Sequence, residues 1–167
     1  VVDSAIKLIE DYRKISSFKR IGISTAGQVD SAAGRIIYAN ENIPGYTGTA
    51  LKDIMERKFG IPTAVENDVN AAAIGEAVFG AGKGVADFVC LTYGTGVGGA
   101  IFANGKLYCG SSCSAGEFGG IVTHPEERDI KEGMFSGCYE KYASTTGLLQ
   151  MIKPYRPELD TGRKIFD

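Results

Sequence analysis

The stretch DFVCLTYGTGVGGAIFANGKL, residues 87–107, decides the fold. A strongly apolar run over 87–93 enters a glycine-rich turn over 94–99, and an alternating run then reaches Asn104-Gly105. Asn-Gly between such runs is a strong signal for a tight hairpin turn. The stretch therefore predicts strand, turn, strand, turn and strand, which is an antiparallel arrangement.

The glycine turn also matches the pattern G-x-G-x-x-G at Gly94, Gly96 and Gly99, and Glu117 follows 18 residues later. In a dinucleotide-binding oxidoreductase this pattern opens a helix, whose N-terminus holds the pyrophosphate. The strand predicted after Gly99 argues against that function. Backbone N–H groups of a tight glycine turn can instead form an anion-binding concavity without a helix, to which Thr95 adds a hydroxyl donor. The alternative is a glycine-rich hairpin without a ligand.

Outward from this stretch, helical and strand patterns alternate, and the hairpins favour an α/β protein with mixed sheets. Ala5, Leu8, Ile9 and Tyr12 recur at helical spacing, and Thr49 is expected to cap a later helix. We expect helices over residues 1–14, 50–59, 68–79 and 137–155. Strands are expected over 18–24 and 62–65, and a hairpin over 29–39. The connector GAGKG, residues 80–84, predicts a boundary between 1–80 and 81–167.

Glu66-Asn67-Asp68 lies where a predicted strand gives way to a predicted helix. Asp is a common helix cap, which is the structural interpretation of Asp68. The functional interpretation is a carboxylate at a strand end that accepts the proton of a substrate hydroxyl, as phosphoryl transfer to an alcohol requires. Asn67 would then hydrogen-bond a polar substrate.

Two further acids are candidates for binding a ligand. Glu117 lies in SAGEFGG, where small neighbours let the backbone approach whatever the carboxylate binds, and Glu140 opens the last predicted long helix. Their structural interpretations are an exposed acid for Glu117 and an acid that suits a helix N-terminus for Glu140.

Composition narrows the function classes. The chain has 167 residues, with 18 Lys+Arg against 20 Asp+Glu and a net charge of −2, so binding of nucleic acid by this segment is not expected. The sequence has no apolar run long enough for a membrane span, and we expect no secretory leader. The four cysteines are too few and too irregular for a disulfide framework, which predicts a reduced, cytoplasmic protein.

The stretches ENDVNAAAIGE (66–76), LTYGTGVGGAIFANGKL (91–107), SAGEFGG (114–120) and GCYEKYAS (137–144), in this order, resemble the ROK family of bacterial sugar kinases and sugar-sensing repressors. The resemblance implies the actin-like, ribonuclease-H-like ATPase fold, an incomplete bilobal kinase here. Residues 1–80 would be the remainder of the N-terminal small lobe, and residues 81–167 the first part of the C-terminal large lobe.

Carried over by position, the resemblance makes Asp68 the catalytic base and Asn67, Glu117 and Glu140 sugar ligands, with neither glutamate facing the phosphate loop. Gly27 would lie in the turn beside the sugar. The phosphate loop would comprise Gly94, Thr95, Gly96 and Gly98. Implied for the full-length protein are ATP and Mg²⁺ as cofactors, a small sugar as substrate and a homodimer.

The sequence departs from the family pattern at the usual zinc site. Gly120, Lys131 and Gly133 stand at three of the four ligand positions, and only Cys138 is retained. Because a structural zinc needs four N or S ligands, we expect no metal there. A substitute set would be Cys109, Cys113, His124 and Cys138.

The N-terminal Asp-x-Gly-Gly-Thr phosphate loop of these kinases is also missing, so the chain is expected to be a fragment that is inactive by itself. The leading function is an ATP-dependent sugar kinase. The alternative is a ROK transcriptional regulator without kinase activity.

Overall fold

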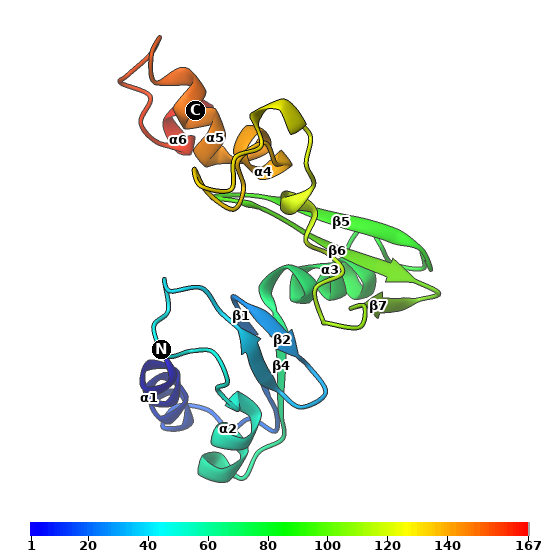
Figure 1. Ribbon diagram of the computed structural model, residues 1–167. Helices are drawn as coiled ribbons and strands as arrows, with labels where there is room; N and C mark the ends of the chain where they lie inside the picture. Colours follow the sequence, from blue (N-terminus) through cyan, green and yellow to red (C-terminus); the bar gives the residue numbers. More distant parts are fainter. Residues whose placement is uncertain (167) are drawn as a thin grey trace. The chain divides into compact units, whose positions relative to one another are not determined.

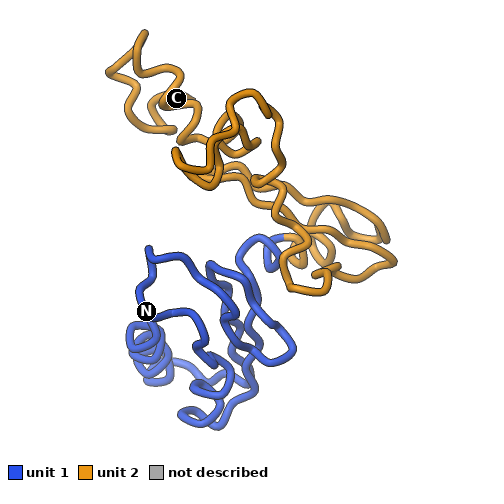
Figure 2. Tube along the Cα trace, viewed as in Figure 1, with its two compact units in different colours: residues 1–72 blue, residues 73–167 orange. Residues whose placement is uncertain are grey.

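The computed structural model describes residues 1–166 and divides the chain into two compact units, Val1–Ala72 and Ala73–Asp167 (Figure 2). The division falls within helix α3 (Asp68–Phe79), eight residues before the expected connector at 80–84. The assignment of 1–80 and 81–167 to two lobes of a larger fold stays a prediction.

Unit 1 contains two small sheets, two complete helices and the first residues of α3 (Figure 1). Strands β1 (Ile21–Thr25) and β4 (Thr63–Asn67) pair in parallel, and β2 (Gln28–Asp30) and β3 (Arg35–Tyr38) form the expected hairpin. In the parallel pair Thr25 lies opposite Asn67. Since the carboxyl ends of parallel strands meet at one edge, this register brings the turn after β1 to the start of α3.

The core of unit 1 lies between these strands and helix α2 (Leu51–Phe59). Met55 and Ile36 are fully buried, and burial of such a side chain contributes about 1.5–3 kcal/mol. The expected cap of α2 is wrong: Ala50 occupies the N-cap position, and no side chain caps the helix. Thr49 instead donates its backbone N–H to Tyr46 O and accepts from Ile36 N, so this residue is committed to the preceding turn.

The expected first helix is present as α1 (Val2–Arg13), and it packs on the core with part of its apolar repeat. Ala5 and Ile9 of that repeat pack against the core, together with Val2 and Ile6. Leu8 belongs to the same repeat but is 71% exposed. The helix has apolar residues on two adjacent faces, and helical spacing alone does not decide between them.

Unit 2 is built on the antiparallel meander β5 (Phe88–Tyr93), β6 (Val97–Ala103) and β7 (Lys106–Tyr108). Asn104 and Gly105 have φ values of 54° and 71°, as the tight hairpin turn requires. Strand β6 includes Gly99, so no helix follows the glycine turn, and this geometry contradicts the dinucleotide-binding alternative.

Beyond the meander the chain is irregular up to residue 138 apart from two 3-10 turns, η1 (Phe118–Gly120) and η2 (Pro125–Glu127). Helices α4 (Tyr139–Ala143), α5 (Thr145–Ile152) and α6 (Gly162–Phe166) follow. The single helix predicted over 137–155 is wrong: Ser144 is extended, with ψ 160°, and its hydroxyl caps α5 through Gly147 N at 3.0 Å. No helix within residues 1–166 is long and apolar enough to cross a membrane.

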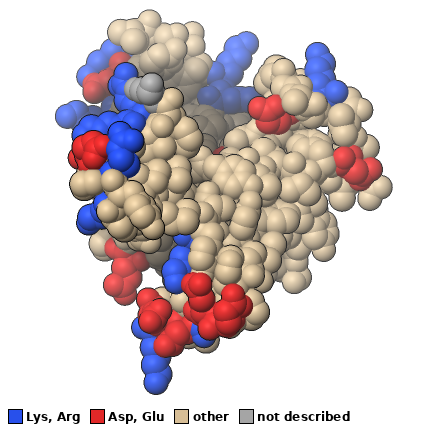
Figure 3. Space-filling view, turned by 90° about the horizontal axis from the view of Figure 1, so that it is seen from above, with Lys and Arg blue, Asp and Glu red and all other residues tan. Residues whose placement is uncertain are grey.

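On the face drawn in Figure 3, basic and acidic side chains are intermixed and much of the surface is uncharged. This distribution fits the net charge of −2. The expectation that this segment binds no nucleic acid stays a prediction.

Candidate active site

Asp68 is the first residue of α3, directly after β4, and its side chain is exposed. Its Oδ1 accepts from Asn67 Nδ2 at 3.0 Å and from the backbone N–H of Val69 at 3.1 Å. The helix is capped by Asn67, whose Oδ1 accepts from Val69 N at 3.0 Å and Asn70 N at 3.1 Å. The capping role considered for Asp68 therefore belongs to its neighbour.

Gly27 lies next to Asn67, as the parallel register of β1 and β4 dictates. The Gly27 carbonyl accepts from Asn67 Nδ2 at 3.0 Å. Its φ is 101°, a conformation that favours glycine, and a Cβ at this position would lie 2.7 Å from Tyr38 O. The backbone conformation and the lack of space therefore each require glycine here. Unit 1 thus brings together three of the predicted site residues, Gly27, Asn67 and Asp68.

Glu66 belongs to the same network, although the sequence analysis assigned it no role. One carboxylate oxygen accepts from Ser31 Oγ at 2.6 Å, and the other accepts from Asn67 N at 2.9 Å and Asn70 Nδ2 at 3.1 Å. The carboxylate therefore fixes the β2–β3 turn and the start of α3 around the Asn67 backbone. Its place beside Asn67 and Asp68 in the sequence was the available signal.

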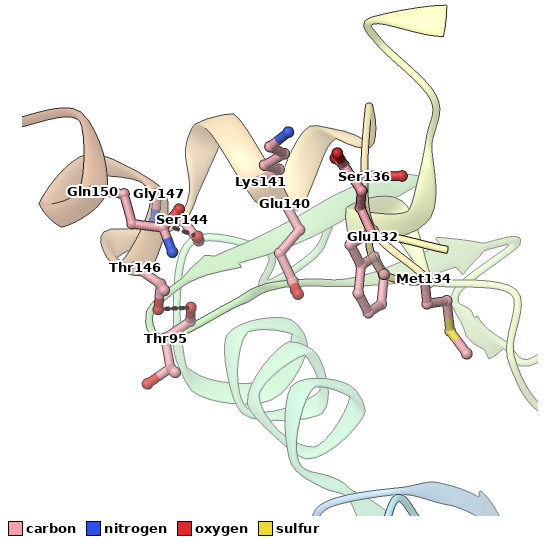
Figure 4. Close-up of a pocket in the computed structure, with 12 residues that line it drawn as sticks. Thr95, Glu132, Met134, Ser136, Glu140, Lys141, Ser144, Thr146, Gly147 and Gln150 are labelled. Atoms are coloured by element: carbon pink, nitrogen blue, oxygen red, sulfur yellow. Dashed lines mark hydrogen bonds between the residues drawn. The ribbon is translucent and has the colours of Figure 1, made fainter. Parts of the chain in front are cut away.

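The predicted phosphate loop is the turn between β5 and β6 in unit 2, and Gly98 lies just inside β6, paired with Thr92. Helix α5 holds the loop: Thr145 N donates to Gly94 O at 2.9 Å, and Thr146 Oγ1 donates to Thr95 O at 2.7 Å (Figure 4). The backbone N–H groups of Thr95 and Gly96 make no hydrogen bond to any residue that the structure describes. These two donors could bind an anion such as a phosphate.

Three glycines in or beside this loop have a structural reason that the sequence pattern did not show. A Cβ on Gly99 would lie 2.2 Å from the Phe118 ring, and one on Gly116 would lie 2.0 Å from Gly99 O. A Cβ on Gly119 would lie 2.5 Å from Val97 O. The segment around η1 therefore packs directly on the backbone of β6, and these glycines allow the close approach.

Glu140 is half-buried and points from α4 towards the strands (Figure 4). Its Oε2 accepts from Val97 N at 2.9 Å, and a Cβ on Gly96 would lie 2.4 Å from that oxygen. The expectation that neither glutamate faces the phosphate loop is therefore wrong for Glu140. It failed because the contact joins positions 43 residues apart, which no local pattern reveals.

Glu117 is exposed and occupies the N-cap position of η1, against which α4 packs. Both predicted acidic sugar ligands thus belong to unit 2, whereas Gly27, Asn67 and Asp68 belong to unit 1. A cavity of about 500 Å³ in unit 2 is lined by Thr95, Glu140, Ser144 and Thr146, together with residues 132–136 (Figure 4).

Two tyrosine hydrogen bonds hold α4 in place. Tyr139 OH lies 2.7 Å from Tyr93 OH at the end of β5, and this bond raises the pKa of Tyr93. Tyr142 OH donates to Glu127, which raises the pKa of Tyr142 to about 12 and lowers that of Glu127. The raised pKa values keep the phenols of Tyr93 and Tyr142 neutral in the physiological pH range, so ionisation of these two groups does not break the bonds to α4.

The positions of the usual zinc ligands do not fit a metal. Within residues 1–166 no three His, Cys, Asp or Glu side chains gather closely enough to hold an ion, so the substitute set of cysteines with His124 does not assemble. Cys138 is 1% exposed, and its sulfur instead faces Arg128. Arg128 Nη1 donates to Met134 O at 2.5 Å, Ser136 O at 2.8 Å and Cys138 Sγ at 3.4 Å. The Arg128 guanidinium therefore lies beside the one retained ligand position.

We therefore expect well under one equivalent of zinc in the full-length protein purified without added metal, since a structural site needs four suitable ligands. Elemental analysis by mass spectrometry checks this expectation. Incubation with zinc followed by desalting is the control for occupancy lost during purification. One equivalent of zinc that disappears in Cys138→Ser would contradict the expectation.

The comparisons with known proteins agree on one family. The profile of the ROK family matches residues 1–167. An uncharacterized protein of Clostridium perfringens is 44% identical over 100% of this chain and 54% of its own length. A glucokinase of Streptomyces coelicolor is 38% identical over 92% of this chain and 47% of its own length. A xylose repressor of Caldicellulosiruptor bescii is 33% identical over 80% of this chain and 33% of its own length.

Among solved structures, a ROK family glucokinase of Streptomyces griseus in complex with glucose and AMPPNP is similar, with a TM-score of 0.76 and 35% identity over 94% of this chain and 49% of that one. This likeness confirms the expected actin-like fold. The chain spans about half the length of the curated relatives it matches.

Proposed function

The chain belongs to the ROK family, and from that premise we propose that the whole protein is an ATP-dependent kinase of a hexose or hexose derivative. The observation that carries the proposal is the carboxylate of Asp68, exposed at the junction of β4 and α3 with one oxygen held by two N–H groups. The relatives that are named glucokinases support sugar phosphorylation in general.

In this proposal, Asp68 accepts the proton of the sugar hydroxyl that becomes phosphorylated, which makes the oxygen a better nucleophile. Gly27, Asn67, Glu117 and Glu140 surround and orient the sugar. Phosphoryl transfer depends mainly on positioning and charge stabilisation, so several fixed hydrogen-bond acceptors serve it well.

ATP with Mg²⁺ supplies the phosphoryl group when bound. The Thr95 and Gly96 N–H groups, which have no partner among the described residues, would hold a phosphate, with Gly94 and Gly98 giving the loop its tight path. We further propose that the full-length protein is cytoplasmic and forms a homodimer. The cytoplasmic location fits the four cysteines of this chain, all of them in its described part, because no disulfide joins them.

A direct test incubates the full-length protein with ATP, Mg²⁺ and a panel of hexoses and N-acetylhexosamines, and detects the sugar phosphate by mass spectrometry. Sugar-dependent formation of a phosphorylated product supports the proposal. Binding of a sugar without turnover of any member of the panel would contradict it.

Sugar binding without turnover would favour the alternative function, a sugar-sensing regulator. The similarity to a xylose repressor is the observation that supports it. The full-length sequence discriminates, because a regulator needs a DNA-binding segment such as a helix-turn-helix.

Replacing Glu117 or Glu140 by Gln in the full-length protein should weaken sugar binding by about one to two decades, because a hydrogen bond to a charged group contributes roughly 1.5–3 kcal/mol. The structure predicts that the two variants differ in their affinity for a nucleotide. Glu140→Gln should also alter the affinity for AMPPNP without sugar, since Glu140 holds Val97 N, whereas Glu117→Gln should not.

Calorimetry with the sugar and with AMPPNP measures both affinities. Glu126→Gln is a matched control, since Glu126 is an exposed acid in η2. Wild-type sugar affinity in both variants would refute the assignment of these acids to the sugar.

A further inference from the structure

The irregular segment before α4, residues 121–138, forms a loop that is closed at its base. Val122 and Cys138 form an isolated antiparallel bridge, and Tyr139 N donates to Ile121 O at 2.7 Å. Within residues 121–138, all of which the structure describes, the 3-10 turn η2 is the one regular element. Because such a loop has few backbone ladders, side chains must fix much of its path.

Arg128, the residue directly after η2, reaches across this loop. Its Nη1 donates to the backbone oxygens of Met134 at 2.5 Å and Ser136 at 2.8 Å, and to Cys138 Sγ at 3.4 Å. One nitrogen therefore gathers the whole end of the loop, residues 134–138. Arg128 is half-buried, and hydrogen bonds from a charged group that is partly removed from water are stronger than neutral or exposed ones.

A second side chain closes the loop beside Arg128. Ser136 is 6% exposed, and its hydroxyl donates to Asp129 O and accepts from Asp129 N at 2.9 Å. A Cβ on Gly137 would lie 3.1 Å from Arg128 N, so the two halves of the loop are in close contact there. The guanidinium therefore lies within a tightly packed loop and is not a mobile surface group.

We propose that Arg128 takes the place of the metal ion as the cross-link of this loop. A structural metal draws together ligands from distant positions, and Cys138 is the one position of the usual ligand set that is retained. Arg128 binds that sulfur and two backbone oxygens just before it. No three His, Cys, Asp or Glu side chains in the described part of the chain gather to hold an ion instead. Since arginine stays charged at any physiological pH, this cross-link needs no metal.

The cross-link ends where α4 begins. Cys138 is the N-cap residue of α4, and Glu140, two residues later, accepts from Val97 N at 2.9 Å. A Cβ on Gly119 would lie 3.2 Å from Glu140 Oε2, so the carboxylate fits a narrow space. A shift of Cys138 would therefore displace Glu140 from Val97 N. Arg128 is thus a positioning residue, which acts through α4 on the turn between β5 and β6.

Arg128→Met in the full-length protein removes the guanidinium and keeps the unbranched, apolar part of the side chain. Because Cys138 is 1% exposed, the closed loop protects its thiol from iodoacetamide. Peptide mass spectrometry measures the alkylation rate of each cysteine. We expect the rate of Cys138 to rise about 10- to 100-fold, the factor by which loss of a charged hydrogen bond shifts a local opening equilibrium.

Cys90 in β5 is the internal reference, and its rate should not change. An unchanged rate at Cys138 would overturn the proposal. An equal rise at both cysteines would show general unfolding and would overturn it as well. Arg156→Met is the matched control, because the side chain of Arg156 is 63% exposed and pairs with Glu158 at the surface. Both rates should stay at wild-type values in this variant.

If Arg128→Met does not fold, Arg128→Lys keeps the test open. Lysine preserves the charge, but its nitrogen ends one bond short of Nη1 and lacks the planar fork, so it should not reach all three acceptors. We expect the same selective rise at Cys138, of smaller size. A wild-type rate in Arg128→Lys would overturn the proposal.

A spectroscopic measurement tests the positioning of Glu140 without any turnover. In the NMR spectrum of the full-length protein with isotope-labelled valine, the backbone amide of Val97 reports on its bond to Glu140, and Glu140→Ala shows where the signal lies when that bond is lost. Arg128→Met should move the signal in the same direction, and Arg156→Met should not. A Val97 signal that stays in place in Arg128→Met would overturn the positioning role.

The wild-type protein supplies the last test. Treatment with a strong chelator should leave the alkylation rate of Cys138 unchanged, because a guanidinium and not a metal closes the loop. A rate that rises after chelation and falls again when zinc is added would show a metal cross-link and overturn the proposal. None of these measurements requires phosphorylation of a sugar, so their outcome is independent of the kinase function proposed above.

Discussion

Asp68→Asn in the full-length protein is expected to lower kcat for sugar phosphorylation by about 10²–10⁴-fold, the usual contribution of a general base. Asparagine preserves the shape of the side chain, and its Oδ1 can still accept from Asn67 Nδ2 and Val69 N. It cannot take the proton of the attacking hydroxyl. Sugar binding should therefore persist, with a Kd close to that of the wild type.

Steady-state kinetics and calorimetry on the same preparation measure the two quantities. Asp30→Asn is the matched control, because Asp30 also accepts a backbone N–H, from Ala33 at 3.0 Å, but in the β2–β3 turn. It should leave kcat close to wild type. A near-normal kcat in Asp68→Asn would reduce Asp68 to a structural residue at the start of α3.

Gly116→Ala is expected to destabilise the protein by about 1–3 kcal/mol or more, the range for overpacking a tight contact. The added Cβ would lie 2.0 Å from Gly99 O and 2.7 Å from Gly99 C. Both atoms belong to the backbone of β6, which cannot move aside as the end of a long side chain can. Relief requires η1 to separate from β6, which would also disturb the surroundings of Glu117.

Gly120→Ala provides the comparison four residues away. Its Cβ would have one neighbour within 4 Å, the Phe135 ring at an ordinary contact distance of 3.9 Å. Urea unfolding of both variants should give a lower midpoint for Gly116→Ala and a midpoint close to wild type for Gly120→Ala. Equal midpoints for the two variants would show that η1 does not pack on β6 as described.

The sequence was informative where local chemistry determines conformation. Helix α3 has the predicted bounds, Asp68–Phe79, and the Asn104-Gly105 hairpin has the predicted turn. Both depend on neighbouring residues, namely a polar cap before an alanine-rich run and two residues that tolerate positive φ.

The failures involve contacts of particular side chains that helical periodicity does not describe. Ser144 interrupts the predicted last helix because its hydroxyl caps a new one, and Gly147 packs where a Cβ would lie 2.1 Å from Lys141 O. The bond between Glu140 and Val97 joins α4 to β6. Helical periodicity contains no information on either contact, so the sequence located Glu140 without its partner.

The close packing of η1 on β6 has a consequence for how this chain can change over evolution. Gly99 and Phe118 share one small space, in which the ring occupies the volume that a side chain at position 99 would need. Among related chains we therefore expect a larger residue at position 99 to accompany a smaller one at position 118. The final glycine of the G-x-G-x-x-G pattern thus has a packing reason in an aromatic residue 19 positions away, and its presence by itself carries no information about a bound nucleotide.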